Sequence, residues 1–165
     1  MKIVETSHRI AQTPKDYLLV GMDEYLISED DMLTYGMANC VGIVAHNAKT
    51  RKGLVGHFIV GTELITKAIP AISDIGHYRD TSVWIGGTSL TTDPAWGEQL
   101  EPMNNGSIEE RQFVLDEFHK LSEAGFLEDT LTVDWGQLNK VTELRLYTAE
   151  ARLLVNKSRA GYIGR

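Results

Sequence analysis

Short apolar runs separated by polar turns recur along the chain, and their spacing predicts a fold with both strands and helices. The segments expected to be strands are residues 17–20 (with 25–27 as an extension or a follower), 41–45, 54–60, 82–85, 130–133, 143–147 and 152–155, and residues 32–36 could end a strand. Residues 47–53 between two of these runs are charged and end in Gly53, as a hairpin loop does. Residues 148–151 predict a second hairpin turn.

Two segments show the spacing of amphipathic helices. The first is 62–77, where Pro70 should kink or interrupt the pattern. The second starts with Ser107 and Glu110 in capping-box form and runs to about Gly125. The expected core stripes are Leu64, Ala68, Ile72 and Ile75 in the first helix, and Val114, Leu115, Phe118, Leu121 and Ala124 in the second.

Between the strand at 82–85 and the second helix lies a stretch rich in turn residues. Residues 91–106 contain Asp93-Pro94, Pro102 and Asn104-Asn105-Gly106, which predict a long loop. A loop of this length in a compact domain is typical of a functional flap or an insertion.

The order of the elements predicts the fold class. The strands, about seven with two helices, come in hairpin-like groups rather than in strict alternation with helices. We therefore expect an α+β domain, a layered sandwich of mixed and antiparallel strands with two main helices. The 165 residues should form a single domain, with polar and less ordered tails at 1–15 and 157–165.

Composition narrows the class of partner. The net charge of −7 argues against a nucleic-acid binder, because such a protein needs a basic surface. The N-terminus has no apolar signal region, and no apolar stretch approaches the length of a membrane span. The single cysteine cannot form an internal disulfide, so we expect a cytoplasmic protein, with export by another route left open.

That cysteine, Cys40, is the first candidate for chemistry. It precedes one apolar run, and His57 lies in the next, so that a hairpin would bring the two side chains together. A thiol beside an imidazole can be ionised and can attack an acyl carbon. The alternative interpretation is that Cys40 is a small buried apolar residue and His57 a satisfied core histidine.

Residues around Cys40 and His57 strengthen the catalytic interpretation. The turn-prone approach from Gly36 to Asn39 allows backbone N–H groups near Cys40 to hold an oxyanion. Gly56 should let a substrate come close to the imidazole. No carboxylate has an obvious position on the two strands, but Thr34, six residues before Cys40, could orient His57 through its hydroxyl.

The spacing Thr-x5-Cys-x16-His resembles the CheD family of chemoreceptor glutamine deamidases. The matching residues are Thr34, Gly36, Cys40, Val41, Val44, Gly53, Gly56 and His57, and the likeness extends more weakly to 84–87, 110–112 and 144–155. Asn39 and Ala38 depart from the family's serine and glycine, 134–137 is shorter than its glycine-rich stretch, and 91–106 is enlarged. Toxins of the cytotoxic necrotizing factor type share this fold and a Cys-His pair.

The resemblance implies a glutamine deamidase with Cys40 as nucleophile, His57 as base and Thr34 as the orienting group. Asn39, Gly36 and Gly56 would form the oxyanion and substrate-binding surroundings, and neither a metal nor an organic cofactor is implied. The partner would be a protein that carries a reactive glutamine, with a regulatory signalling protein as a further partner. Two alternatives stay open, namely a secreted effector that acts on a host protein and a non-catalytic binding module.

The remaining motifs give weaker indications of function. His8, His46, His77 and His119 lack metal-ligand spacing. The glycine pair at 86–87 lacks the lysine of a phosphate loop and is expected to permit close packing or to line a cleft. Trp84 is expected in the core, and Trp96 is either a core anchor or a partner contact.

Overall fold

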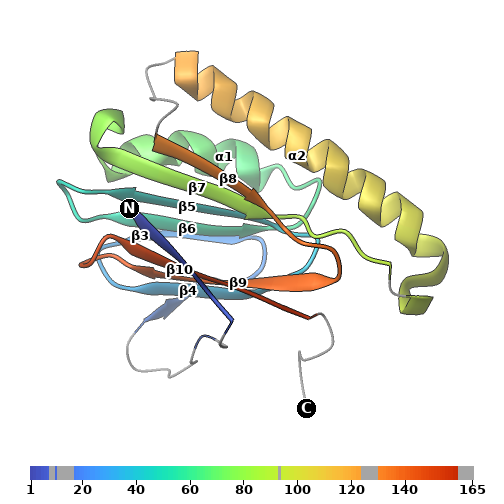
Figure 1. Ribbon diagram of the computed structural model, residues 1–165. Coiled ribbons are helices and arrows are strands. Elements are labelled where there is room, and N and C mark those ends of the chain that lie inside the picture. The colour runs from blue at the N-terminus through green and yellow to red at the C-terminus, as the bar shows by residue number, and fades with distance from the viewer. Residues whose placement is uncertain (8–9, 11–16, 93, 124–129, 160–165) are drawn as a thin grey trace.

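The protein is built from two five-stranded sheets packed face to face, with two helices over the outer face of one of them (Figure 1). This description comes from a computed structural model and covers residues 1–7, 10, 17–92, 94–123 and 130–159, without the side chains of 94–96, 120–123 and 159. The predicted α+β sandwich of mixed and antiparallel strands with two main helices is confirmed.

The elements follow one another along the chain in an order that mixes strands and helices. The strands are β1 (Lys2–Thr6), β2 (Leu18–Leu19), β3 (Glu24–Ser28), β4 (Met32–Met37), β5 (Val41–Asn47), β6 (Gly53–Phe58), β7 (Thr81–Gly87), β8 (Leu131–Trp135), β9 (Lys140–Tyr147) and β10 (Arg152–Arg159). The helices are α1 (Leu64–Ala71) and α2 (Leu100–Glu123), with 3-10 turns η1 (Ile72–Ile75), η2 (Tyr78–Asp80) and η3 (Pro94–Gln99).

The first sheet has the strand order β1-β10-β9-β4-β2, and the second has the order β3-β6-β5-β7-β8. Most neighbours are antiparallel, but β1 with β10, β2 with β4, and β7 with β8 are parallel. The β5–β6 pair is the predicted hairpin, and its turn is held by the Asn47 side chain, which accepts the N–H groups of Lys49 and Thr50 at 3.0 Å.

Side chains of β5 alternate between two cores because successive residues point to opposite faces. Val41, Ile43 and Ala45 pack beneath α1 and α2. Cys40 and Val44 belong to the core between the sheets. The inter-sheet core is therefore the layer that holds the cysteine.

The first helix follows the predicted pattern in two pieces. α1 continues through Pro70 to Ala71 and then gives way to the tighter turn η1. Ala68, Ile72 and Ile75 are buried, whereas Leu64 is only partly buried against the same core. The lost N–H of proline is consistent with this change of helix type.

The predicted loop at 91–106 is wrong, because η3 and the first turns of α2 occupy it. The α2 helix begins at Leu100, so Pro102 lies in the first turn, where its missing N–H removes no intrahelical bond. Asn104 turns its side chain back to Thr91, accepting the N–H at 3.0 Å and donating to the carbonyl at 2.9 Å. These tertiary contacts outweigh the local turn propensity.

The predicted capping box is wrong for the same reason. Ser107 lies inside α2 and is fully buried, and Glu110 accepts the Gly61 N–H at 3.0 Å instead of reaching back to the serine. In the predicted stripe, Val114 and Phe118 are buried and Leu115 is partly buried. The side chain of Leu121, all of Ala124 and the predicted helix end at Gly125 lie outside the described residues.

The tails also differ from the prediction. Residues 2–6 form β1, an edge strand paired in parallel with β10, because the apolar Ile3 and Val4 can add to an open sheet edge. β10 itself extends to Arg159, and the rest of the predicted C-terminal tail lies outside the described residues. The predicted strand at 17–20 is reduced to the two residues of β2.

Candidate active site

Cys40 and His57 face the same side of the second sheet, toward the first. Gly42 lies directly opposite His57 in the β5–β6 ladder, and Cys40 comes two residues before Gly42. This register puts Cys40 diagonally across from His57, a relation with a Cα spacing of about 7–8 Å. Gly42 has no side chain to separate them, and Met37 and Leu144 fill the space above it.

Thr34 meets His57 from the opposite sheet. Its Oγ1 lies 2.9 Å from His57 Nδ1, and both residues are buried. His57 Nε2 is also buried and has no hydrogen-bond partner among the described residues. The hydroxyl therefore fixes the ring orientation and leaves the other nitrogen available.

The route of the chain between Thr34 and Cys40 differs from the extended run that we expected. β4 is bulged between Thr34 and Met37, and Gly36 within the bulge has φ +80°, a left-handed conformation that favours glycine. A bend at 38–39, which contains the half-buried Asn39, then carries the chain into the second sheet. Thr34 and Cys40 thus lie on facing sheets.

Burial decides the resting protonation of the pair. It lowers the pKa of His57 to about 4, against an opposing effect of the Asp23 charge. Burial first, and the Asp23 charge second, raise the pKa of the Cys40 thiol to about 11. At neutral pH the site therefore holds a thiol and a neutral imidazole, not a thiolate–imidazolium pair.

Asp23 is the site residue that the sequence did not reveal. Its N–H donates to the His57 carbonyl at 2.6 Å, and its Oδ1 is buried with no partner among the described residues. It lies in the turn before β3 with φ 63°, a conformation that aspartate tolerates better than most residues. The available signal was an aspartate just before a strand that pairs with the histidine strand.

The backbone around Cys40 is held by the segment after β7. The N–H groups of Thr88 and Ser89 donate to the carbonyls of Cys40 and Ala38, both at 2.7 Å. Gly87 has φ +91°, and a Cβ there would lie 2.3 Å from the Cys40 carbonyl oxygen. The glycine pair at 86–87 therefore permits close packing, one of its two expected roles.

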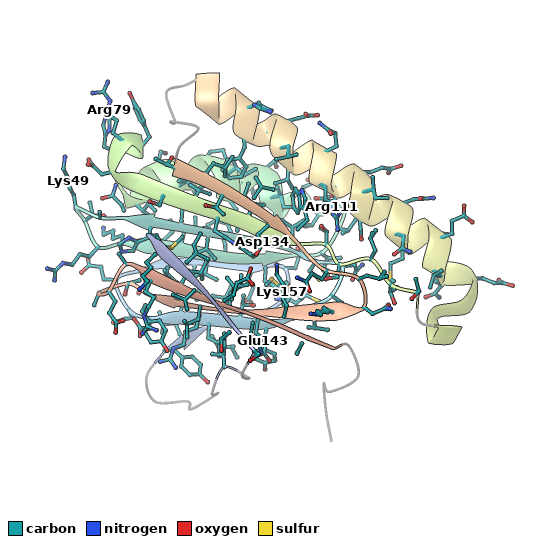
Figure 2. All side chains as sticks on the ribbon, viewed as in Figure 1. Lys49, Arg79, Arg111, Asp134, Glu143 and Lys157 are labelled. Carbon is teal, nitrogen blue, oxygen red and sulfur yellow. The ribbon has the colours of Figure 1, made fainter. Side chains whose placement is uncertain are left out.

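Arg111 of α2 supports this arrangement from the helix layer (Figure 2). Its Nε donates to Thr88 Oγ1 at 2.8 Å, its Nη2 donates to the Thr88 carbonyl, and its guanidinium lies 5.6 Å from the Trp135 ring centre. With the carbonyls engaged, the N–H groups of Asn39 and Cys40 donate to no described residue outside the strand ladders. The predicted oxyanion site would use these two N–H groups.

Gly56 does not lie beside the imidazole. A Cβ at Gly56 would meet the Phe58 ring at 2.4 Å, and Phe58 belongs to the core under the helices. The absence of a side chain at this position therefore makes room for Phe58.

Two further findings concern the described residues as a whole. No group of three or more histidine, cysteine, aspartate or glutamate side chains among them could hold a metal ion. Within the same part of the chain, no helix combines the length and apolar character that a membrane crossing requires.

The structural likeness that comparison with known proteins gives is weak. No family model matches the chain, and neither does any curated protein. The crystal structure of the hypothetical protein YfiH from Bacillus licheniformis is similar with a TM-score of 0.39 and 8% identity, over 68% of this chain. This chain spans about half of that one, with 49% covered.

Proposed function

We propose that this protein hydrolyses the side-chain carboxamide of a glutamine in a partner protein, through a thioester on Cys40. The observation that carries the proposal is the hydrogen bond of 2.9 Å between Thr34 Oγ1 and His57 Nδ1, on the face that also holds Cys40. An oriented histidine with a free Nε2 beside a thiol is the arrangement that nucleophilic acyl transfer requires.

The neutral resting pair defines the first step. His57 Nε2 takes the Cys40 proton as the sulfur attacks the amide carbon, and the N–H groups of Cys40 and Asn39 stabilise the oxyanion by about 3 kcal/mol per donor. His57 then protonates the leaving nitrogen, the C–N bond breaks, and ammonia departs. A water molecule loses a proton to His57 and attacks the thioester, and the proton returns to the sulfur as the carboxylic acid leaves.

The resemblance to the CheD family makes a chemoreceptor the first partner to test. Surface segments select protein partners, so the departures at 38–39 and 134–137 bear on the identity of that partner. A secreted effector would use the same chemistry on a host protein.

One observation favours a non-catalytic binding module as the second candidate. Cys40 is only 6% exposed, and burial moves the pKa of its thiol away from neutrality. A binding module would keep the fold without any need for a reactive thiol.

Mass spectrometry of candidate receptors separates the two functions. We expect wild-type protein to convert one glutamine to glutamate, a gain of about one mass unit, through the acyl-enzyme route. Cys40→Ser should not do so, whereas His46→Gln, a change at a second buried histidine, should. Receptor binding without any glutamine conversion by the wild type would overturn the deamidase and favour the binding module.

A further inference from the structure

A small cavity lies between α1 and α2, outside the candidate active site. Its volume is about 340 Å³, within the range of cavities that hold small ligands. Its walls come from the turn after β6, the first turn of α1 and the middle of α2, and they include Gly61, Glu63, Thr66, Glu110 and Phe113. None of these residues has a part in the proposed reaction, so the cavity needs an account of its own.

Glu110 gives this cavity a buried carboxylate with one unsatisfied oxygen. The residue is only 7% exposed, and its Oε2 accepts the Gly61 N–H at 3.0 Å. Its Oε1 is buried and has no hydrogen-bond partner among the described residues. Because Gly61 also lines the cavity, the carboxylate bonded to it lies at the cavity wall. Buried polar atoms are nearly always hydrogen-bonded, so Oε1 calls for a donor from a ligand.

The groups around Glu110 favour a donor that is positively charged. Thr66 Oγ1 donates its proton to the Glu63 carbonyl, so this hydroxyl has only lone pairs to offer a ligand. Glu63 adds a second, exposed carboxylate. The N-terminus of α1 contributes about half a positive charge, which the two carboxylates outweigh. The Phe113 side chain is 37% exposed, and an aromatic ring attracts a cation to its face.

We propose that this cavity binds a primary ammonium group at the end of an alkyl chain, as in a lysine side chain or a free alkylamine. The inference goes beyond the proposed function and does not depend on it. The ammonium group donates to Glu110 Oε1, with Thr66 Oγ1 as a further acceptor on the wall, and the alkyl chain packs on Phe113. Burial raises the pKa of Glu110, against the opposing effect of the Gly61 hydrogen bond, and a bound cation favours the charged carboxylate.

Three variants isolate the carboxylate and the ring. Glu110→Gln keeps an acceptor for the Gly61 N–H but replaces the second oxygen by an NH2 group, which only donates. Glu109→Gln is the matched control, because Glu109 is the neighbouring carboxylate on α2, is exposed and does not line the cavity. Phe113→Leu keeps an apolar side chain and removes the aromatic ring.

The experiment follows the Gly61 amide signal by NMR, at constant ionic strength, while n-butylammonium chloride, N-acetyl-lysine methylamide or n-butanol is added to the full chain. We expect both amines, and not the alcohol, to shift this signal to saturation. Glu110→Gln should weaken amine binding at least about 10-fold, because a hydrogen bond to a charged group is lost. Phe113→Leu should weaken it about 3-fold, and Glu109→Gln should leave it unchanged. Tighter binding of the lysine derivative would identify a partner protein's side chain as the ligand, and equal binding a free amine.

An equal shift with n-butanol would reveal a merely apolar cavity and would overturn the inference. Unaltered amine binding by Glu110→Gln, or no saturable shift with either amine, would also overturn it. Melting temperatures show whether the variants fold, and if Glu110→Gln does not, unchanged affinity in Phe113→Leu overturns the inference instead. Cys40→Ser should bind both amines as the wild type does, so a failure of the proposed deamidation would leave this result standing.

Discussion

His46 and His57 lie on neighbouring strands, face the same space between the sheets and are both buried. Each bonds one ring nitrogen to a threonine of the other sheet or its turn. His57 Nδ1 meets the Thr34 hydroxyl at 2.9 Å, and His46 Nε2 meets the Thr148 carbonyl at 2.8 Å. In each histidine the second ring nitrogen is buried without a partner among the described residues.

The two sites differ in the nature of the partner atom and in their neighbours. A carbonyl oxygen can only accept, so it requires His46 to carry its proton on Nε2, whereas a hydroxyl accepts or donates. His57 also has Cys40 diagonally across the ladder and Asp23 bonded to its backbone. Burial and one hydrogen bond are therefore common to both, and the thiol and the carboxylate distinguish the candidate base from a core histidine.

The largest expected difference is in deamidation rate, when each histidine is replaced by Asn or Gln, whichever better keeps its existing hydrogen bond. Asn places a polar atom near Nδ1, which suits His57→Asn, and Gln places one near Nε2, which suits His46→Gln. We expect His57→Asn to lower deamidation by about 10³-fold, because it removes the general base, and His46→Gln to change it by less than about 3-fold. Initial rates on the receptor substrate measure both.

Thermal unfolding of the two variants supplies the control. Comparable melting temperatures would show that the difference in rate is chemical rather than structural. Equal losses of activity in both variants would remove the distinction between the two histidines.

The next largest expected effect is the loss of folding stability as pH falls below 6.5. The pKa of folded His57 is lowered to about 4 from 6.5, so between these values the unfolded chain binds more protons than the folded chain. Stability is then fully present above pH 6.5 and falls as pH drops toward 4, by on the order of 3 kcal/mol for this group. Urea unfolding across this window should show a shallower fall for His57→Asn than for the wild type.

His46 should contribute to the same loss of folding stability at acid pH. Burial also lowers the pKa of His46, against the opposing effect of the Thr148 hydrogen bond. His46→Gln therefore tests whether the two sites share this property. A pH dependence that is identical in wild type and His57→Asn would show that His57 is not held neutral by the fold.

Local pattern was sufficient for the strands that carry the site. The apolar runs at 41–45 and 54–60 and the turn at 47–53 predict the hairpin that puts Cys40 and His57 on one face. The spacing also led to Thr34, although the chain reaches Cys40 through a bulge at Gly36 and a change of sheet. The contact thus depends on two facing sheets, a relation that strand periodicity alone does not contain.

The features that the sequence did not reveal depend on distant partners. α2 starts at Leu100, and the Asn104 side chain in its second turn is held by two hydrogen bonds to the Thr91 backbone. Asp23 enters the site through a bond to the His57 backbone. In each case a turn-forming residue has a role that only the packed neighbour defines.

The smallest expected difference between the two histidines is the ring nitrogen that carries the proton in each. For His57 Nε2 to accept the thiol proton, Nδ1 must carry the ring proton and donate to Thr34 Oγ1, which is the opposite tautomer from His46. Side-chain nitrogen NMR at neutral pH should show a protonated Nδ1 for His57 and a protonated Nε2 for His46. Thr34→Val should cost about 1 kcal/mol of stability and abolish the preference for a protonated Nδ1, because neither ring nitrogen would then have a hydrogen-bond partner among the described residues. Thr34→Ser, which keeps a hydroxyl, should preserve the wild-type tautomer. A wild-type His57 that already carries its proton on Nε2 would mean that Thr34 donates to the ring, and the ring would then have no lone pair free for Cys40.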